Sequence, residues 1–371
     1  MVTAGNDSRC LAFYLPQYHP IAENDAWWGP GFTEWTRTAA ARPRFRGHAQ
    51  PVLPGELGFY DLRVPEVRAA QAALASAHNV HGFVYYHYWF SGRRLLERPF
   101  DEVLASGEPA FPFALCWANE SWSRTWDGGG DQVLLEQTYG TDDDRRHIES
   151  LLPAFADPRY VRVDGRPLFL VYRSGQLPDP RRTTAVWRSI ARSAGIGELY
   201  LARVESFADE HDDPRPLGWD ASVEFQPDWR SMPFASTPSL AVRVGDRLLR
   251  TGRLRGDAPD IVDYDATVAR MLAKPAVPWT QHPCVSPGFD NTPRRLDGGL
   301  VIEGSTPDRY GAWVEAVRHG RSTDDARFLF VNAWNEWGEG NHLEPDALHG
   351  RSFLEAHSRA WSRSWAPTSD H

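Results

Sequence analysis

The stretch Phe328-Leu-Phe-Val-Asn-Ala-Trp-Asn-Glu-Trp-Gly-Glu-Gly340 joins an apolar run to a cluster of polar residues. Its first part, Phe328–Val331, is apolar and contains aromatic and β-branched residues, which predicts a short buried strand. Glu336 and Glu339 follow where that strand should end. In parallel α/β folds, ligands bind beyond the carboxyl ends of the strands. The stretch therefore predicts the last strand of such a fold and a binding site directly after it.

Seven further apolar runs have the length and composition of strands. They occupy residues 11–15, 82–89, 113–117, 167–172, 199–204, 221–225 and 280–285. Helical spacing of apolar residues is found between most of them and after the last strand, at residues 66–78, 142–155, 183–194, 264–273, 308–318 and 352–361. Eight strands that mostly alternate with helices predict an α/β fold of the (β/α)8 TIM-barrel type, with extended loops at the carboxyl ends of the strands. The alternative is a doubly wound open sheet, which usually carries a glycine-rich first turn; Pro16-Gln-Tyr-His19 is not one.

We expect one catalytic barrel domain over residues 1–371, with loop insertions near residues 27–59 and 227–262. The first insertion is aromatic and rich in proline and glycine. The second is polar and irregular, which indicates either a lid or a disordered loop.

The composition excludes several classes of protein. The net charge is -9 and the arginines are scattered, which argues against a nucleic-acid partner because phosphate binding needs a basic face. The three cysteines form no Cys-x-x-Cys pair, so neither a disulfide framework nor a zinc site is expected. Cys116 and Cys284 are predicted to be buried thiols. The chain begins with no basic segment followed by an apolar stretch, and it has no run of about 18 apolar residues, so we expect a cytoplasmic protein without a membrane span.

The chain contains 16 tryptophans, more than packing alone explains. Tryptophan rings stack on the apolar faces of sugars. Trp35, Trp117 and Trp122 are predicted to be such platforms, with burial in the core as the alternative.

Carboxylates, amides and aromatic rings also follow the other predicted strands. Because sugars present hydroxyl groups to carboxylates and amides, these residues predict a carbohydrate site. Asn119 and Glu120 are expected to hold sugar hydroxyls, and a catalytic role for Glu120 stays open. His19 is expected to bond either the substrate or Glu34. The predicted substrate-binding residues are His19, Glu34, Trp35, Tyr86, His87, Tyr88, Trp117, Asn119, Glu120, Trp122, Asp290, Asn291, Trp334 and Asn335.

Two details refine this set. Side chains alternate in direction along a strand, so only some of Tyr86, His87 and Tyr88 can face the site. Asp290 and Asn291 are expected to line the pocket, and Arg294 is expected to pair with one of the acids of that pocket.

Other site types lack their motifs. The chain has no Gly-x-x-x-x-Gly-Lys phosphate cradle, no Gly-x-Ser-x-Gly elbow and no His-Glu-x-x-His. Histidines beside aromatic residues more often form hydrogen bonds than bind metal, so no metal and no cofactor are expected at His19, His87, His282 or His342.

Two close carboxyl groups suit the cleavage of a glycosidic bond. The leaving oxygen needs a proton, and the anomeric carbon needs stabilisation or attack. One carboxyl group must stay protonated near neutral pH, which burial and a nearby like charge achieve by raising its pKa. Glu336 and Glu339 are the predicted pair. Their spacing in the sequence does not decide between retention and inversion of configuration.

Six segments resemble those of the WbsX-like proteins, a group related to glycoside hydrolase family 99. They are Phe13–Pro20 (FYLPQYHP), Trp27–Trp35 (WWGPGFTEW), Tyr85–Phe90 (YYHYWF), Cys116–Trp122 (CWANESW), Gly288–Arg294 (GFDNTPR) and Asn332–Glu339 (NAWNEWGE). They occur in the order of the family, and the resemblance covers almost the whole chain.

The resemblance implies a (β/α)8 barrel that acts on glycans. In the hydrolase family a Glu-Trp-x-Glu motif carries both catalytic carboxylates, so Glu336 corresponds to the base and Glu339 to the acid. Those hydrolases are endo-α-mannosidases that retain configuration, by a proposed route through a 1,2-anhydro sugar. Members of the WbsX-like branch often accompany surface-polysaccharide synthesis, and some are described as glycosyltransferases.

Three hypotheses follow. The first is a retaining glycoside hydrolase that uses Glu336 and Glu339. The second is a glycosyltransferase or transglycosidase that builds a surface or natural-product glycan. The nearest approach to a metal-diphosphate motif, Asp142-Asp-Asp144, opens a predicted helix and is better explained as N-terminal charge on that helix, which counts against a metal-dependent transferase. The third is a glycan-binding barrel without catalysis.

Overall fold

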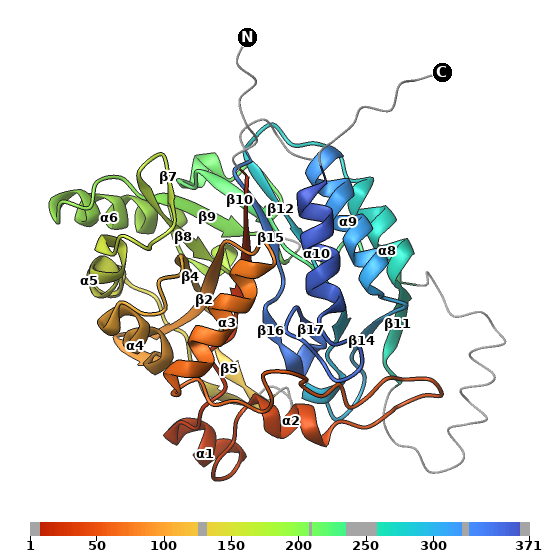
Figure 1. Ribbon diagram of the computed structural model, residues 1–371. Helices are drawn as coiled ribbons and strands as arrows, with labels where there is room; N and C mark the ends of the chain where they lie inside the picture. The colour runs from red at the N-terminus through yellow and green to blue at the C-terminus, as the bar shows by residue number, and fades with distance from the viewer. Residues whose placement is uncertain (1–7, 125–131, 208–209, 235–257, 321–325, 364–371) are drawn as a thin grey trace, which may run out of the picture.

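The computed structural model describes residues 8–124, 132–207, 210–234, 258–320 and 326–363. Eight parallel strands form a closed barrel (Figure 1). Around the barrel they follow the order of the chain: β1 (Arg9–Tyr14), β2 (Gly82–Phe90), β4 (Phe113–Trp117), β8 (Arg166–Val171), β9 (Tyr200–Val204), β10 (Ala221–Glu224), β12 (Gln281–Val285) and β15 (Phe328–Val331). Because β1 pairs with both β2 and β15, the sheet is closed and the TIM-barrel prediction is confirmed.

Helices surround the strands (Figure 1). The six predicted helices are observed as α3 (Pro65–Ala77), α5 (Thr141–Ala156), α6 (Pro180–Ser193), α8 (Tyr264–Leu272), α9 (Pro307–Gly320) and α10 (Ser352–Ser362). Three more were not predicted: α1 (Ala22–Trp28), α2 (Glu34–Ala40) and α4 (Arg98–Ser106). With seven to nine residues each, these three are too short to show a clear helical period in the sequence.

Short strands and single 3₁₀ turns extend the loops. The short strands are β3 (Arg93–Leu95), β5 (Trp122–Ser123), β6 (Val133–Leu135), β7 (Arg162–Val163), β11 (Asp260–Asp263), β13 (Phe289–Asp290), β14 (Leu300–Glu303), β16 (Asn335–Glu336) and β17 (Asn341–His342). The turns are η2 (Ser174–Gln176), η3 (Arg215–Leu217), η4 (Thr292–Arg294) and η5 (Trp337–Glu339). These short elements thus belong to the loops that connect the barrel strands with the helices.

The first predicted insertion, residues 27–59, contains α2. Figure 1 shows α1 and α2 at the end of the barrel that lies away from both termini. Residues 235–257 of the second predicted insertion lie outside the described residues.

Aromatic side chains fill the barrel interior. The ring of Phe13 on β1 lies 5.1 Å from the ring of Phe225, and 5.6 Å from those of Tyr86 and Phe330, between ring centroids. Burial of such rings is a large part of the stabilisation of a folded core. Cys116 and Cys284 are buried free thiols, as predicted. Among the described helices, none has both the length and the apolar character needed to cross a lipid bilayer.

Candidate active site

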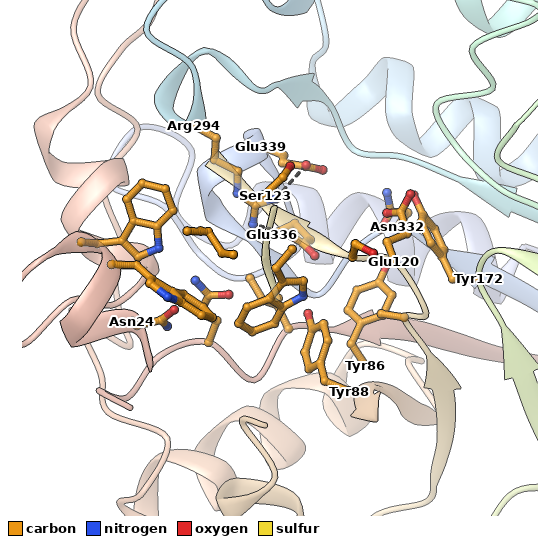
Figure 2. A pocket seen from close by; sticks show the side chains of 18 of the residues that line it. Asn24, Tyr86, Tyr88, Glu120, Ser123, Tyr172, Arg294, Asn332, Glu336 and Glu339 are labelled. Carbon is orange, nitrogen blue, oxygen red and sulfur yellow. Dashed lines mark hydrogen bonds and ion pairs between the residues drawn. The ribbon is translucent and has the colours of Figure 1, made fainter. Parts of the chain in front are cut away.

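A cavity of about 360 Å³ opens at the carboxyl ends of the strands. We call it the strand-end cavity. Its wall comes from residues that end or follow β1, β2, β4, β8, β10, β12 and β15, and from α1. Figure 2 shows Glu336, Glu339 and Arg294 on one side, with Tyr86 and Tyr88 rising from β2 towards Glu336. The polar and aromatic lining residues are Gln17, Asn24, Trp27, Trp28, Tyr86, Tyr88, Glu120, Ser121, Trp122, Ser123, Tyr172, Phe225, Arg294, Asn332, Glu336 and Glu339.

The loop after β15 is held in place by the loop after β1. The side-chain oxygen of Asn335 accepts from the amide of Leu15 at 2.7 Å, and its nitrogen donates to the carbonyl of Leu15 at 3.0 Å. Tyr18 donates its hydroxyl hydrogen to the carbonyl of Asn335. Trp334 donates its amide to the carbonyl of Phe13 at 2.8 Å. Trp334 and Asn335, both predicted to bind substrate, are fully buried and fix the loop rather than line the strand-end cavity.

Arg294 bridges three carboxylates. Its Nε lies 2.5 Å from Glu34 Oε1, its Nη2 lies 2.6 Å from Glu336 Oε2, and its Nη1 lies 2.7 Å from Glu339 Oε1. We call these four residues the arginine cluster. The prediction that Arg294 pairs with an acid of the pocket is confirmed, since Glu336 and Glu339 line the strand-end cavity. Asp290 is not among its partners. Asp290 instead accepts from His48 and Gln50, each at 2.6 Å.

The glycine of the Glu-Trp-Gly-Glu motif makes room for this cluster. A Cβ atom on Gly338 would lie 1.7 Å from Glu34 Oε1 and 2.7 Å from Arg294 Nε. Contacts under about 3.0 Å are essentially absent from real structures. The ion pair between Glu34 and Arg294 therefore leaves no room for a larger residue than glycine at position 338.

The two predicted catalytic carboxyl groups differ in their surroundings. The side chain of Glu336 is 7% exposed and that of Glu339 is 27% exposed. Burial raises the pKa of Glu336; Arg294 opposes this effect, and the negative charges of Glu339 and Glu34 add to it. One member of a catalytic pair must stay protonated near neutral pH. The raised pKa of Glu336 favours Glu336 as that member. This is the reverse of the base and acid roles implied by the resemblance.

Aromatic rings form another part of the wall of the strand-end cavity. The ring centroid of Trp122 lies 5.7 Å from that of Trp27 and 5.2 Å from that of Tyr88. Trp122 lines the strand-end cavity, together with Trp27 and Trp28, which were not among the predicted binding residues. The sequence signals for these two were their place in the first insertion and in the segment Trp27–Trp35, which resembles the WbsX-like proteins.

Trp35 and Trp117 do not line the strand-end cavity. Trp35 is buried, and its Nε1 donates to the carbonyl of Tyr60 at 2.8 Å. Trp117 is 1% exposed and contacts His147 on α5 and Trp187 on α6. Both belong to the core, which was the alternative considered for them.

The side chains of Tyr86, His87 and Tyr88 on β2 do not all point to the same side of the strand. Tyr86 and Tyr88 line the strand-end cavity, whereas the ring of His87 stacks on that of His147, with 3.0 Å between their Nε2 atoms. Side chains alternate along a strand, so His87 points to the outside of the barrel.

Glu120 and Asn119 follow β4 and have different surroundings. Glu120 lines the strand-end cavity and pairs with Arg173. Asn119 is fully buried: its Nδ2 donates to the carbonyl of Arg173 at 2.9 Å, and its Oδ1 accepts from the Arg173 amide at 2.8 Å. Asn119 therefore positions the loop, and Glu120 remains the third carboxylate of the cavity.

Four other predicted binding residues lie outside the strand-end cavity. His19 Nδ1 contacts the carbonyl of Pro16 at 3.1 Å, not Glu34. Asn291 accepts from the amide of Leu300 at 2.8 Å. Glu34 lies 1% exposed behind Arg294. Asp290 lines a separate cavity of about 190 Å³ together with His342.

No group of His, Cys, Asp and Glu side chains suited to a metal ion occurs in the described ranges. Across those ranges, Arg294 is the one basic residue on the wall of the strand-end cavity, and it already has three carboxylate partners. The described part of the wall thus presents carboxylates, amides, hydroxyl groups and aromatic rings.

A family model described as Glycosyltransferase WbsX matches residues 10–357. Two curated proteins from two strains of Xanthomonas campestris pv. campestris, both described as Uncharacterized protein WxcX, are 44% identical over 357 residues. The match covers 95% of this chain and 50% of each of those proteins, so the chain spans about half the length of these curated relatives.

Solved structures share the fold. A structure described as a glycoside hydrolase-like protein has a TM-score of 0.59 at 14% identity, with 98% of this chain and 96% of that chain covered. The GH99 endo-alpha-mannosidase from Bacteroides thetaiotaomicron, with and without BIS-TRIS-propane, has a TM-score of 0.54 at 16% identity, with 95% and 96% covered. At these identities the likeness shows a common fold.

Proposed function

The chain belongs to the WbsX family, and from this membership and the geometry of the strand-end cavity we propose that it is a glycoside hydrolase that acts on a glycan. Glu336 and Glu339 would be its catalytic carboxyl groups. The observation that carries the proposal is their common contact with one guanidinium group at the wall of that cavity.

The geometry supports a pair that acts on one bond. Both carboxyl groups contact terminal nitrogens of Arg294, at 2.6 and 2.7 Å. They are therefore close enough to flank a glycosidic oxygen, since glycosidase carboxyl groups lie roughly 5–9.5 Å apart. The proposed course is retention of configuration, on the strength of the resemblance to family 99 and the fold shared with its endo-alpha-mannosidase.

The aromatic wall supports a carbohydrate ligand. Trp27, Trp28 and Trp122 line the same cavity as the carboxyl groups. A sugar offers C–H faces to such rings and hydroxyl groups to Glu120 and Asn332, so one cavity satisfies both kinds of contact.

The second candidate is a transferase, favoured by the description of the family model. A nucleotide-sugar donor brings a diphosphate, which needs cations or free backbone amides. The only described cation on the cavity wall, Arg294, is already shared by three carboxylates. That charge balance favours a glycoside over a nucleotide sugar. A transglycosidase, in which an acceptor sugar takes the place of water, fits the same residues.

The test is an assay of the protein on α-mannosides and on bacterial surface polysaccharides, with product anomers followed by NMR. We expect hydrolysis with retention and a loss of roughly 10²–10⁴-fold in Glu339→Gln. Glu56→Gln, which alters an exposed ion pair with Arg351, is the control. Turnover that requires a nucleotide sugar would overturn the proposal in favour of a transferase. Glycan binding without any turnover would indicate a lectin-like barrel.

A further inference from the structure

We propose that Arg294, held in place by Glu34, is a positioning residue that orients the Glu336–Glu339 pair and limits its negative charge. The inference rests on the proposed function only in that it takes this pair to be the reacting one. It adds two residues, neither of which would touch the scissile bond, to the account of the site.

Three distant parts of the chain meet at one guanidinium group. Glu34 begins α2, Arg294 ends η4, and the two carboxyl groups lie on β16 and η5. Each of the three nitrogens of Arg294 contacts a different carboxylate. A guanidinium is planar with fixed donor directions, so it sets the relative orientation of its partners; a lysine ammonium cannot do this.

The local backbone is built around this contact. α2, η4 and η5 pack against one another. Because Gly338 has no side chain, Glu34 can pass over the loop between Glu336 and Glu339 and reach Arg294. Glu34 is almost fully buried and does not line the strand-end cavity, so contact with substrate does not explain it. Its role is to hold Arg294.

The charges are unequal. Three carboxylates surround one guanidinium, and burial makes the remaining negative charge costly. A proton held on one carboxyl group relieves this, and burial of Glu336, together with Glu339 and Glu34, raises its pKa. Removing Glu34 should leave more of the Arg294 charge to the pair and lower that pKa. Removing Arg294 should raise it.

Other groups also face the pair and set the background of any titration. They are Tyr18 after β1, Tyr86 and Tyr88 on β2, Glu120 after β4, Tyr172 after β8, and Glu344, which lies behind Trp337. None of them is altered in the variants below, so differences between variants report on the arginine cluster.

The experiment follows the infrared absorption of protonated carboxyl groups against pH in the intact protein. The band of Glu336 is the one lost in Glu336→Gln. Its midpoint should fall in Glu34→Gln and rise in Arg294→Met, by on the order of one pH unit each. Asp157→Asn is the matched control, because the partly buried Asp157–Arg159 pair lies at the opposite end of β4 and should leave the midpoint unchanged.

Turnover gives the second measurement. Arg294→Lys keeps the charge but not the planar fork, so kcat should fall by roughly 10²-fold while KM changes little. A purely structural role would lower the melting temperature without moving the infrared midpoint. If Arg294→Met does not fold, Glu34→Gln decides the question.

The outcomes separate the two proposals. An unchanged midpoint in folded Glu34→Gln overturns the positioning role, whatever the activity. A shifted midpoint in a protein that hydrolyses no glycan would sustain the positioning role and refute the proposed function.

Discussion

Two groups of charges that are mostly buried lie beside the barrel strands, and only one of them includes residues that line the strand-end cavity. The arginine cluster comes from α2 and from the loops after β12 and β15. The other group, which we call the lysine cluster, consists of Arg203, Glu205, Glu224, Asp228 and Lys274. In the lysine cluster, Lys274 Nζ lies 3.1 Å from Glu224 Oε1 and also pairs with Asp228. Gln281 Nε2 donates to Glu205 Oε2 at 2.6 Å.

The two clusters have similar chemistry but different access. Both combine carboxylates with at least one basic side chain, and both contain a glutamate whose pKa is raised by burial. No member of the lysine cluster lines the strand-end cavity, whereas Arg294, Glu336 and Glu339 all do. Buried ion pairs contribute little to stability on average, because desolvation offsets attraction. Contact with the strand-end cavity is therefore the feature that distinguishes a candidate catalytic cluster from a structural one.

The largest expected effect tests this difference between the two clusters. Glu336→Gln and Glu339→Gln should each lower kcat/KM on the glycan substrate by roughly 10²–10⁴-fold. Glu205→Gln, a matched change in the lysine cluster, should leave kcat/KM within a few-fold. The measurement is steady-state kinetics on variants whose folding is verified by circular dichroism. Equal losses in all three would show that access to the strand-end cavity is no guide to function.

A second comparison lies within the arginine cluster itself. The buried Glu336 is favoured to hold the proton, whereas the resemblance implies that Glu339 is the acid. A substrate with a good leaving group, such as a dinitrophenyl glycoside, needs no proton from the enzyme. The variant that lacks the acid should therefore recover to within about 10-fold of the parent on this substrate. If Glu336→Gln recovers and Glu339→Gln does not, burial assigns the roles; the opposite result favours the resemblance.

The sequence predicted the barrel well because its signals are local. Each strand is an apolar run bounded by polar residues, and the observed boundaries lie within two residues of the predicted ones. Placing Glu336 and Glu339 after the last strand used the same kind of signal, and both line the strand-end cavity.

Two of the errors at the site, at His87 and Trp117, have a common cause, which is strand register. His87 pairs with Trp117 across β2 and β4. Neighbours in register face the same side of a sheet, so the outward direction of His87 carries Trp117 outwards as well, towards His147. Composition alone made Trp117 a plausible sugar platform. Without the register, no sequence signal separated it from Trp122.

The contact of Arg294 with Glu34 could not be predicted from the sequence either. The two residues are 260 positions apart and lie in segments with no regular pattern. The only trace in the sequence is Gly338, whose small size is required by a contact that appears once the loops are folded.

Gly338→Ala should have a smaller effect than loss of a carboxyl group. The added Cβ would lie within 3 Å of both Glu34 and Arg294, so the arginine cluster must rearrange. A displacement of about 1 Å at a catalytic group costs up to roughly 10²-fold, and we expect a fall in kcat of about 10–100-fold. Gly140→Ala is the control, since its Cβ would meet no atom within 4 Å. An unaltered kcat in Gly338→Ala would show that the site tolerates displacement of the cluster.

The smallest expected effect concerns stability in the lysine cluster. Burial raises the pKa of Glu205 to about 7, above an ordinary value of 4.5. An acid with a raised pKa in the folded state stabilises the fold in its protonated form. This contribution is complete below about pH 4.5 and is lost as the pH rises through 7.

Glu205→Gln removes that dependence. Between pH 5 and pH 8, the free energy of unfolding of the variant should fall by about 2–3 kcal/mol less than that of the parent. Urea denaturation at the two pH values measures this difference. The pH profile of kcat/KM should stay the same, because Glu205 does not line the strand-end cavity. A shifted activity profile would mean that the two clusters are electrostatically coupled, and the separation between a structural and a catalytic group of charges would no longer hold.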